Sequence, residues 1–359
     1  MNCNYFPIQG LNGIKLCSKG TIIIWVFVLF FVFTCIAAIS PVSAHAPANT
    51  GSNEDISNAT IIVNPEKSYA IYTDLHQSGE AQYYKFSMQK GQQLFGTVQV
   101  PDSGSMVMDI VIIGPGIVSS GNVPPFIEIP AGSGAMVIEG TKPGKPTYEP
   151  FTPQPIYEVA HFNLTVPEDG DYYIAAYGPG GGNYGFSPGF LEQFTISEWL
   201  LIPISVISIY LWSGQSLALV ITPFLFIVIS GLALLIFYQK KSGKRWGYRK
   251  WIVLFSGLLY LGGVTVTITQ TIHTLLLTGY SYGVLLTLIF IVIPSILGIV
   301  IIREGLSLTR EKRSVPLTGL LILIVGLLGL IMWAGFIIGP VLAILGGTLV
   351  IIYPMKKNQ

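Results

Sequence analysis

Long apolar segments alternate with short basic loops in this chain, and no other feature of the sequence constrains its fold as strongly. Of 19 lysines and arginines, 14 fall into four clusters, namely Lys15 and Lys19, residues 240–250, residues 303–313, and Lys356 and Lys357. The stretches that separate the last three clusters are apolar and long enough to span a bilayer. Because short basic loops stay on the cytoplasmic side, we expect all four clusters inside the cell.

Acidic residues are concentrated in one segment, residues 45–198. This segment holds 16 of the 18 acidic residues, five lysines and no arginine, so its net charge is −11. With the basic clusters inside, the acidic segment is expected to be extracellular, and residues 355–359 form a cytoplasmic tail. The predicted localisation is therefore the plasma membrane, crossed several times. Nucleic acid is not an expected partner, because the external domain is acidic and the basic loops are short.

The composition agrees with a polytopic membrane protein. Hydrophobic residues make up 51% of the chain and charged residues only 10%, and the mean hydropathy is +0.62. All three cysteines, Cys3, Cys17 and Cys35, precede the acidic segment, which therefore contains no disulfide. A secreted domain of about 150 residues can be stable through its core alone.

Residues 1–44 have the pattern of a secretory signal. Lys15 and Lys19 precede an apolar run over 21–39, and small residues follow before His45. Cleavage is expected after Ala44 or Ala46. The apolar run is also long enough to cross the membrane, so an uncleaved anchor is the alternative. Both interpretations place the acidic segment outside.

Residues 45–198 are predicted to form an antiparallel β-sandwich. β-prone runs recur between Gly, Pro, Asn and Asp at residues 60–63, 69–73, 82–88, 92–100, 106–113, 135–139, 156–164, 171–177 and 190–196. Alternation within 83–88 places Tyr84, Phe86 and Met88 in the core. Residues 141–155, rich in proline, are expected to form a long surface loop, and the glycine-rich residues 178–183 a second loop.

Two passages resemble a known family. Residues 79–86 (GEAQYYKF) with 90–94 (KGQQL), and residues 166–174 (VPEDGDYYI), are similar to motifs of bacterial and archaeal pre-peptidase C-terminal domains. Residues 109–115 lie where that family has a further strand, here in an isoleucine-rich variant. The resemblance covers roughly residues 68–197. It implies a jelly-roll-like sandwich that acts as a secreted accessory or binding module without catalysis, in a prokaryotic and specifically archaeal cell.

Two asparagines match the glycan-acceptor pattern on the predicted outer side. Asn58 begins the sequence Asn-Ala-Thr and Asn163 the sequence Asn-Leu-Thr. Both are candidate glycosylation sites, although the pattern is common by chance and Asn163 falls within a predicted strand.

Copper is one candidate ligand of the external domain. Cleavage after Ala44 would leave His45 at the N-terminus, where an amine and an imidazole together suit copper. A second histidine would complete the site, and His76 and His161 are the other external histidines. The competing interpretation is that His45 simply follows a signal peptide in a flexible leader.

Calcium is the second candidate. Glu168, Asp169 and Asp171 lie within four residues around Gly170 and offer the oxygen ligands that this ion prefers. A turn between two strands explains the same residues without an ion. The sequence has no catalytic motif, and no other cofactor is expected.

The second half is predicted to be a helical membrane region. Residues 199–212 are apolar but short for a span, and the tryptophans at both ends favour an interfacial helix, with a connector to 215. A five-helix transmembrane bundle is expected over 216–354, with spans at 216–238, 251–272, 283–302, 317–334 and 337–353. The last two spans arise from one apolar run that is broken at residues 335–340 by glycine and proline.

Small residues recur every four positions near the C-terminus. Gly335, Gly339, Ala343 and Gly347 would form one ladder on a helix, which allows close packing in a compact bundle or a homo-oligomer. The predicted spans carry no acidic or basic side chain at mid-membrane, which argues against a charge-coupled transporter.

The leading hypothesis is a non-enzymatic binding or scaffolding protein of the cell surface. Its sandwich would recognise an envelope polymer, a glycan or another membrane protein, and its helices would anchor it in the bilayer. The alternatives are a metal-handling or transport-associated protein, with His45 and the external acids delivering copper or calcium, and an accessory subunit of a membrane enzyme.

Overall fold

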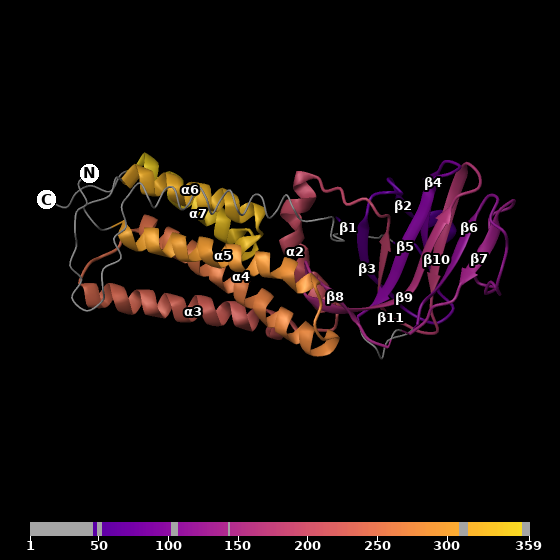
Figure 1. Cartoon of the computed structure of the whole chain (residues 1–359), viewed down its shortest axis with the longest axis horizontal. Coiled ribbons are helices and arrows are strands. Elements are labelled where there is room, and N and C mark those ends of the chain that lie inside the picture. Colours follow the sequence, from indigo (N-terminus) through magenta and orange to yellow (C-terminus); the bar gives the residue numbers. More distant parts are fainter. Residues whose placement is uncertain (1–45, 49–51, 102–106, 143, 309–314, 354–359) are drawn as a thin grey trace. The chain divides into compact units, whose positions relative to one another are not determined.

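The computed structural model describes residues 46–48, 52–101, 107–142, 144–308 and 315–353. All of them belong to one compact unit, Ala44–Gln359. Within it a β-rich region precedes a helical region (Figure 1). The predicted signal, residues 1–44, and the predicted tail, residues 355–359, lie outside the described residues.

The β-rich region consists of two sheets, as predicted. The first has the strand order β1 (Ala46–Ala48), β3 (Tyr69–Leu75), β11 (Gly182–Pro188), β5 (Gln93–Val100), β9 (Gln154–Thr165) and β8 (Thr147–Glu149). The second has the order β2 (Thr60–Ile62), β4 (Ala81–Met88), β10 (Gly170–Tyr177), β6 (Asp109–Gly114) and β7 (Gly134–Ile138). Neighbouring strands are antiparallel except for two pairs, because β1 runs parallel to β3 and β2 parallel to β4.

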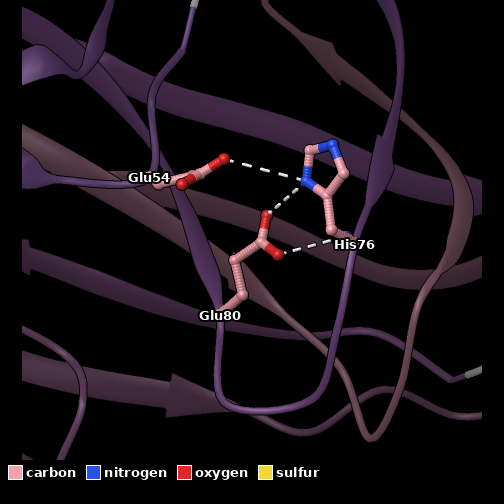
Figure 2. A group of neighbouring side chains, drawn as sticks. All are labelled: Glu54, His76 and Glu80. Atoms are coloured by element: carbon pink, nitrogen blue, oxygen red, sulfur yellow. Dashed lines mark hydrogen bonds and ion pairs between the residues drawn. The ribbon is translucent and has the colours of Figure 1, made fainter.

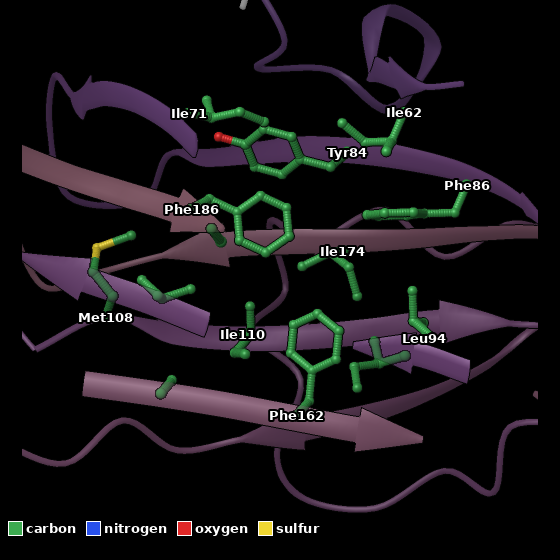
Figure 3. Packing of buried hydrophobic residues seen from close by; sticks show 14 of the residues in the cluster. Ile62, Ile71, Tyr84, Phe86, Leu94, Met108, Ile110, Phe162, Ile174 and Phe186 are labelled. Atoms are coloured by element: carbon green, nitrogen blue, oxygen red, sulfur yellow. The ribbon is translucent and has the colours of Figure 1, made fainter. Parts of the chain in front are cut away.

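The main core lies between the two sheets (Figure 3). The predicted alternation in β4 is confirmed, because Tyr84, Phe86 and Met88 all point into this core and are at most 4% exposed. From the opposite sheet, Phe162 of β9 and Phe186 of β11 pack against them with their rings 6.3 Å apart. Burial of these large side chains supplies most of the driving force for folding of the sandwich.

The second sheet is also covered on its outer face. A smaller apolar cluster there contains Tyr83 and Val111 of the sheet together with Ile127 from the long loop between β6 and β7. The backbone N–H of Glu128 donates to the Tyr83 hydroxyl at 3.0 Å, which ties this loop to β4. Because both faces of β6 are buried, its sequence is continuously apolar at 110–113 rather than alternating.

One predicted strand was wrong. Residues 190–196 form no strand apart from a single bridge at Leu191, and the strand at this point of the chain is β11, Gly182–Pro188. The predicted loop over 178–183 is therefore too long by two residues. Gly185 lies directly against Gln99 of β5, where a Cβ atom would come within 2.8 Å of the Gln99 side chain. Glycine avoids a clash at this close approach. Because glycine has no side chain that would indicate a strand, the sequence does not predict one here.

The predicted surface loop over 141–155 was also wrong in part. It contains the short strand β8, which pairs with the start of β9 to make a hairpin. Tyr148 and Pro150 in this hairpin are buried against the helical region rather than exposed to solvent.

A first helix, α2 (Ile196–Trp212), follows the sandwich and begins three residues before the predicted start at 199. Its N-terminus is fixed by a capping box, in which the Thr195 hydroxyl accepts the Glu198 N–H and the Glu198 carboxylate accepts the Thr195 N–H. Glu198, the predicted last residue of the sandwich, therefore belongs to this helix.

Five further helices match the predicted spans: α3 (Leu217–Ser242), α4 (Tyr248–Thr278), α5 (Gly283–Ser307), α6 (Val315–Ile331) and α7 (Ile338–Ile352). Three of them, α3, α4 and α5, are long and apolar enough to cross a membrane. Helices α6 and α7 have 17 and 15 residues, which correspond to about 25 Å and about 22 Å. α4 packs against α3, α5 and α7.

Large apolar side chains cover the outside of the helical region. Phe226, Leu234 and Phe237 of α3, for example, are 65–69% exposed. Apolar surface of this extent is unfavourable in water and is what lipid chains cover. The structure thus has the surface of a membrane protein.

A break in the last apolar run is confirmed, but it begins earlier than the predicted residues 335–340, and Pro340 lies within α7. Residues 332–337 separate α6 from α7, and a short 3₁₀ turn (Ala334–Phe336) lies within them. Trp333, Phe336 and Ile337 have φ values of 51°, 54° and 67°. Non-glycine residues rarely adopt this left-handed region, so their packing must hold the turn in place.

The ladder of small residues faces other helices of the same chain. A Cβ atom on Gly335 or Gly339 would contact Leu259 and Tyr260 of α4, and one on Gly347 would lie 2.7 Å from the Gly319 carbonyl of α6. Ala343 is fully buried. These residues already serve packing within one molecule, so a homo-oligomer through the same ladder would require α7 to separate from α4 and α6.

Gly347→Ala tests this close packing. The added methyl group would press on the α6 backbone, which cannot move aside as a flexible side chain can, so we expect a loss of about 1–3 kcal/mol. Thermal unfolding of the detergent-solubilised full chain measures it. Gly247→Ala, at a position with nothing within 4 Å, is the matched control. Equal stability of both variants would contradict the packing described.

Candidate functional site

The strand pairing brings two connections of the sandwich side by side. The chain passes from the first sheet to the second between β1 and β2, and again between β3 and β4. Because β1 is parallel to β3 and β2 is parallel to β4, both connections run at the same end of the sandwich. Glu54 lies in the first connection, and His76 and Glu80 lie in the second.

These three side chains converge on one point (Figure 2). The Nδ1 atom of His76 is 3.2 Å from Oε1 of Glu80 and 3.7 Å from Oε1 of Glu54. One ligand atom from each residue lies within 4.8 Å of the other two. Asp74 lies on the other side of the ring, with Oδ2 3.8 Å from Nε2.

Hydrogen bonds hold the Glu80 side chain and the main chain next to Glu54 in place. The Glu80 carboxylate accepts the N–H groups of His76 and Gln77, at 3.1 and 3.2 Å, and its side chain is only 8% exposed. Glu54 follows Asn53, which is buried and exchanges hydrogen bonds with the backbone of Tyr83 in β4. His76 and Glu54 are themselves more than half exposed, so the cluster is open to solvent.

The carboxylates alter the titration of the imidazole. The hydrogen bond between the His76 ring and the Glu80 carboxylate, and then the negative charges of Glu80, Asp74 and Glu54, raise the pKa of His76 above its usual range.

His45 and His161 do not join this cluster in the part of the chain that the structure describes. His45 lies outside the described residues. His161 is an exposed residue of β9, opposite Thr97. Strands β11 and β5 lie between β3 and β9, and at about 4.8 Å per strand this places the two strands about 14 Å apart. His76 and His161 are therefore too far apart to share one ion.

Two of the residues predicted to bind calcium, Asp169 and Asp171, bind other groups of the protein at the start of β10. Oδ1 of Asp169 accepts the Lys90 N–H at 2.6 Å. Asp171 accepts the Ser87 hydroxyl and forms an ion pair with Lys85 at 2.7 Å, which lowers its pKa. Together with Glu168 they form no group with metal-ligand spacing in the described region. The geometry is that of a turn joining two strands.

Both candidate glycan acceptors are exposed. Asn58 ends a 3₁₀ turn (Ile56–Asn58), and Asn163 lies on β9 opposite Phe95. The structure therefore leaves both side chains accessible, and their modification stays a prediction.

A second region of interest is the junction between sandwich and helices. Thr287 of α5 donates to the Pro150 carbonyl at 2.7 Å, and its hydroxyl pairs with the Tyr148 hydroxyl at 2.9 Å. Trp212, at the end of α2, donates to the Thr73 carbonyl of β3 at 3.0 Å. Lys67 forms an ion pair with Glu198 of α2 at 2.6 Å.

Aromatic rings complete this junction. Phe151, at the tip of the β8–β9 hairpin, contacts Phe290 and Trp333 at centroid distances of 5.9 and 6.2 Å. Trp333 stacks on Phe290 at 4.9 Å and donates its indole N–H to the Trp199 carbonyl. These contacts hold Trp333 in its left-handed backbone conformation.

A pocket with a mostly apolar lining lies beside these rings. It is lined by Tyr72, Gln99, Glu149, Thr152, Ser205 and Trp333, among others. Burial and, to a lesser extent, the charge of Glu192 raise the pKa of the Glu149 carboxyl to about 7, although a hydrogen bond from the Phe151 N–H opposes the shift. Glu149 is thus the acidic group whose charge changes near neutral pH at this junction.

Comparison with protein-family models and with curated protein sequences gives no match to this chain. The function proposed below therefore rests on the arrangement of the described side chains and helices.

Glu149→Gln tests the state of this carboxyl. The pKa is about 7 in the folded protein and about 4.5 in the unfolded chain, so Glu149 favours folding below pH 4.5 and loses this contribution as the pH rises through 7. The loss is at most about 3 kcal/mol. We expect Glu149→Gln to unfold at a higher temperature than the unmodified protein at pH 8, and the difference to shrink towards pH 5.

Glu158→Gln, at an exposed position of β9, is the control and should show no such trend. A parallel pH profile for both variants would contradict the assignment.

Proposed function

We propose that this chain is a multi-pass membrane protein that displays a non-catalytic binding domain on the cell surface. The sandwich would recognise an envelope polymer, a glycan or another surface protein. The observation that carries the proposal is the junction: the sandwich contacts α2 and α5 directly through the β8–β9 hairpin, β3 and Lys67. A domain fixed in this way keeps a defined position relative to its anchor.

The arrangement of the helix ends supports an outward sandwich. The Lys250 amine at the start of α4 donates to the Leu306 carbonyl at the end of α5, so Lys250 and Arg303, which belong to two of the basic clusters, lie at the same end of the helices. The hairpin contacts α5 at Thr287. From Thr287 to Leu306 the helix rises about 28 Å, close to the thickness of a bilayer core of about 30 Å. With the basic end inside, the sandwich is outside.

The family resemblance of residues 68–197 supports the same function, since domains of that kind are accessory or binding modules. The five helices α3 to α7 would each cross the membrane, with the two shorter ones tolerated by local thinning of the bilayer. Helix α2 would lie at the outer interface, where Trp199 and Trp212 suit the headgroup region.

Cysteine labelling tests the orientation. In a variant without native cysteines, Val118→Cys introduces a thiol at a position that is 83% exposed on the sandwich, and Arg245→Cys introduces one in an exposed basic loop. A membrane-impermeant maleimide should label Val118→Cys in intact cells and Arg245→Cys only after permeabilisation. The reverse pattern would overturn the proposal.

Photo-crosslinking tests the binding role. A photoreactive amino acid at Val63 or Val118, both more than 80% exposed, should give adducts with an external polymer, glycan or protein in intact cells. The matched control is Leu234, which is exposed on the apolar outside of α3 and should yield lipid adducts. Absence of adducts from several exposed sandwich positions would contradict a surface-binding function.

A further inference from the structure

The geometry points to a binding site for a divalent transition-metal ion of the zinc type, formed by Glu54, His76 and Glu80 (Figure 2). This site is independent of the proposed surface-binding function. It also differs from a copper site with His45 and His161, because its other ligands are carboxylates from the two sheet-crossing connections.

The distances match those of a coordinated ion. Two ligand atoms that each lie about 2.0–2.1 Å from a tetrahedral zinc ion are about 3.3 Å apart. The Nδ1 atom of His76 lies 3.2 Å from Glu80 Oε1 and 3.7 Å from Glu54 Oε1. An ion that takes the place of the proton would draw the Glu54 oxygen toward Glu80, since these two oxygens lie within 4.8 Å of each other. The exposure of His76 leaves a fourth position open to water.

The donor types select the class of ion. One imidazole nitrogen and two carboxylate oxygens suit zinc and its neighbours in the transition series. Calcium requires six to eight oxygen ligands and does not use imidazole. The site should therefore discriminate against calcium, although three carboxylates lie nearby.

The charge of the surroundings favours a cation. Glu54, Asp74 and Glu80 place three carboxylates around one imidazole. Within the described residues, no lysine or arginine forms an ion pair with any of them. A divalent ion would compensate the negative charge of these carboxylates.

The Glu80 carboxylate and the main chain next to Glu54 are already positioned before an ion binds. Backbone N–H groups of His76 and Gln77 hold the Glu80 carboxylate, and the hydrogen bonds of Asn53 to β4 hold the backbone next to Glu54. Little conformational entropy is then lost on binding. The bound ion would connect the segment before β2 to the connection between β3 and β4, and so link the two crossings between the sheets.

Titration calorimetry of the full chain in detergent, stripped of metal with a chelator, tests the site. With Zn²⁺ we expect saturable binding of one ion per chain, and a loss of affinity of at least tenfold in His76→Gln and in Glu54→Gln. Both side chains are exposed, so neither variant should impair folding. Co²⁺ should give the visible absorption of a four- or five-coordinate ion, and His76→Gln should abolish it.

His161→Gln is the matched control, since it removes another exposed histidine of the same sandwich. Unchanged binding in this variant supports the assignment. Three results would overturn it: no stoichiometric Zn²⁺ binding, an equal loss in His161→Gln, or Ca²⁺ binding of similar strength that survives His76→Gln. The last result would indicate a cluster of acidic residues without a transition-metal site.

Discussion

The seating of the β8–β9 hairpin against α5 determines how the two regions of this protein fit together. A hairpin that leaves its sheet to lie among helices exposes backbone groups where little water is present, and each of these groups needs a partner. Thr287 supplies one for the Pro150 carbonyl. In β3, outside the hairpin, Trp212 donates in the same way to the Thr73 carbonyl. Phe151 then fills the space between Phe290 and Trp333. The turn between α6 and α7 keeps its strained backbone because Trp333 is held in this group of rings.

Much of this fold was predictable from the sequence because two periodicities are clear in it. The apolar runs gave the positions of α3, α4 and α5 closely, and the strands with alternating side chains, such as β4, were found near their true bounds. Strand β11 was missed because Gly185 lacks the side chain that marks a strand, although Tyr184 and Phe186 alternate around it. The start of α2 could have been found, since Thr195 and Glu198 have the spacing of a capping box. The buried hairpin could not, because its prolines are typical of a surface loop until the helix that covers it is known.

The candidate metal site could be predicted from the sequence only in part. His76 was singled out by residue type alone, and Glu80 could have been added because it follows by four residues in a turn closed by Gly79. No local signal connects Glu54 to them. That connection depends on two parallel strand pairs, β1 with β3 and β2 with β4, in a sandwich expected to be antiparallel. The same limitation applies to Glu149, whose shifted pKa results from its burial in the junction.

The parallel edge strands explain why an ion would be useful at this position. β1 and β2 have three residues each, so their ladders contain few hydrogen bonds. β2 buries Ile62 in the core but leaves Ile61 67% exposed, and Val63, which follows the strand, is 86% exposed. Short edge strands of this kind limit unwanted pairing with other chains, but they also attach the beginning of the sandwich weakly. The hydrogen bonds of Asn53 are one link between this segment and β4. A metal ion held by Glu54, His76 and Glu80 would add a second link beside the first.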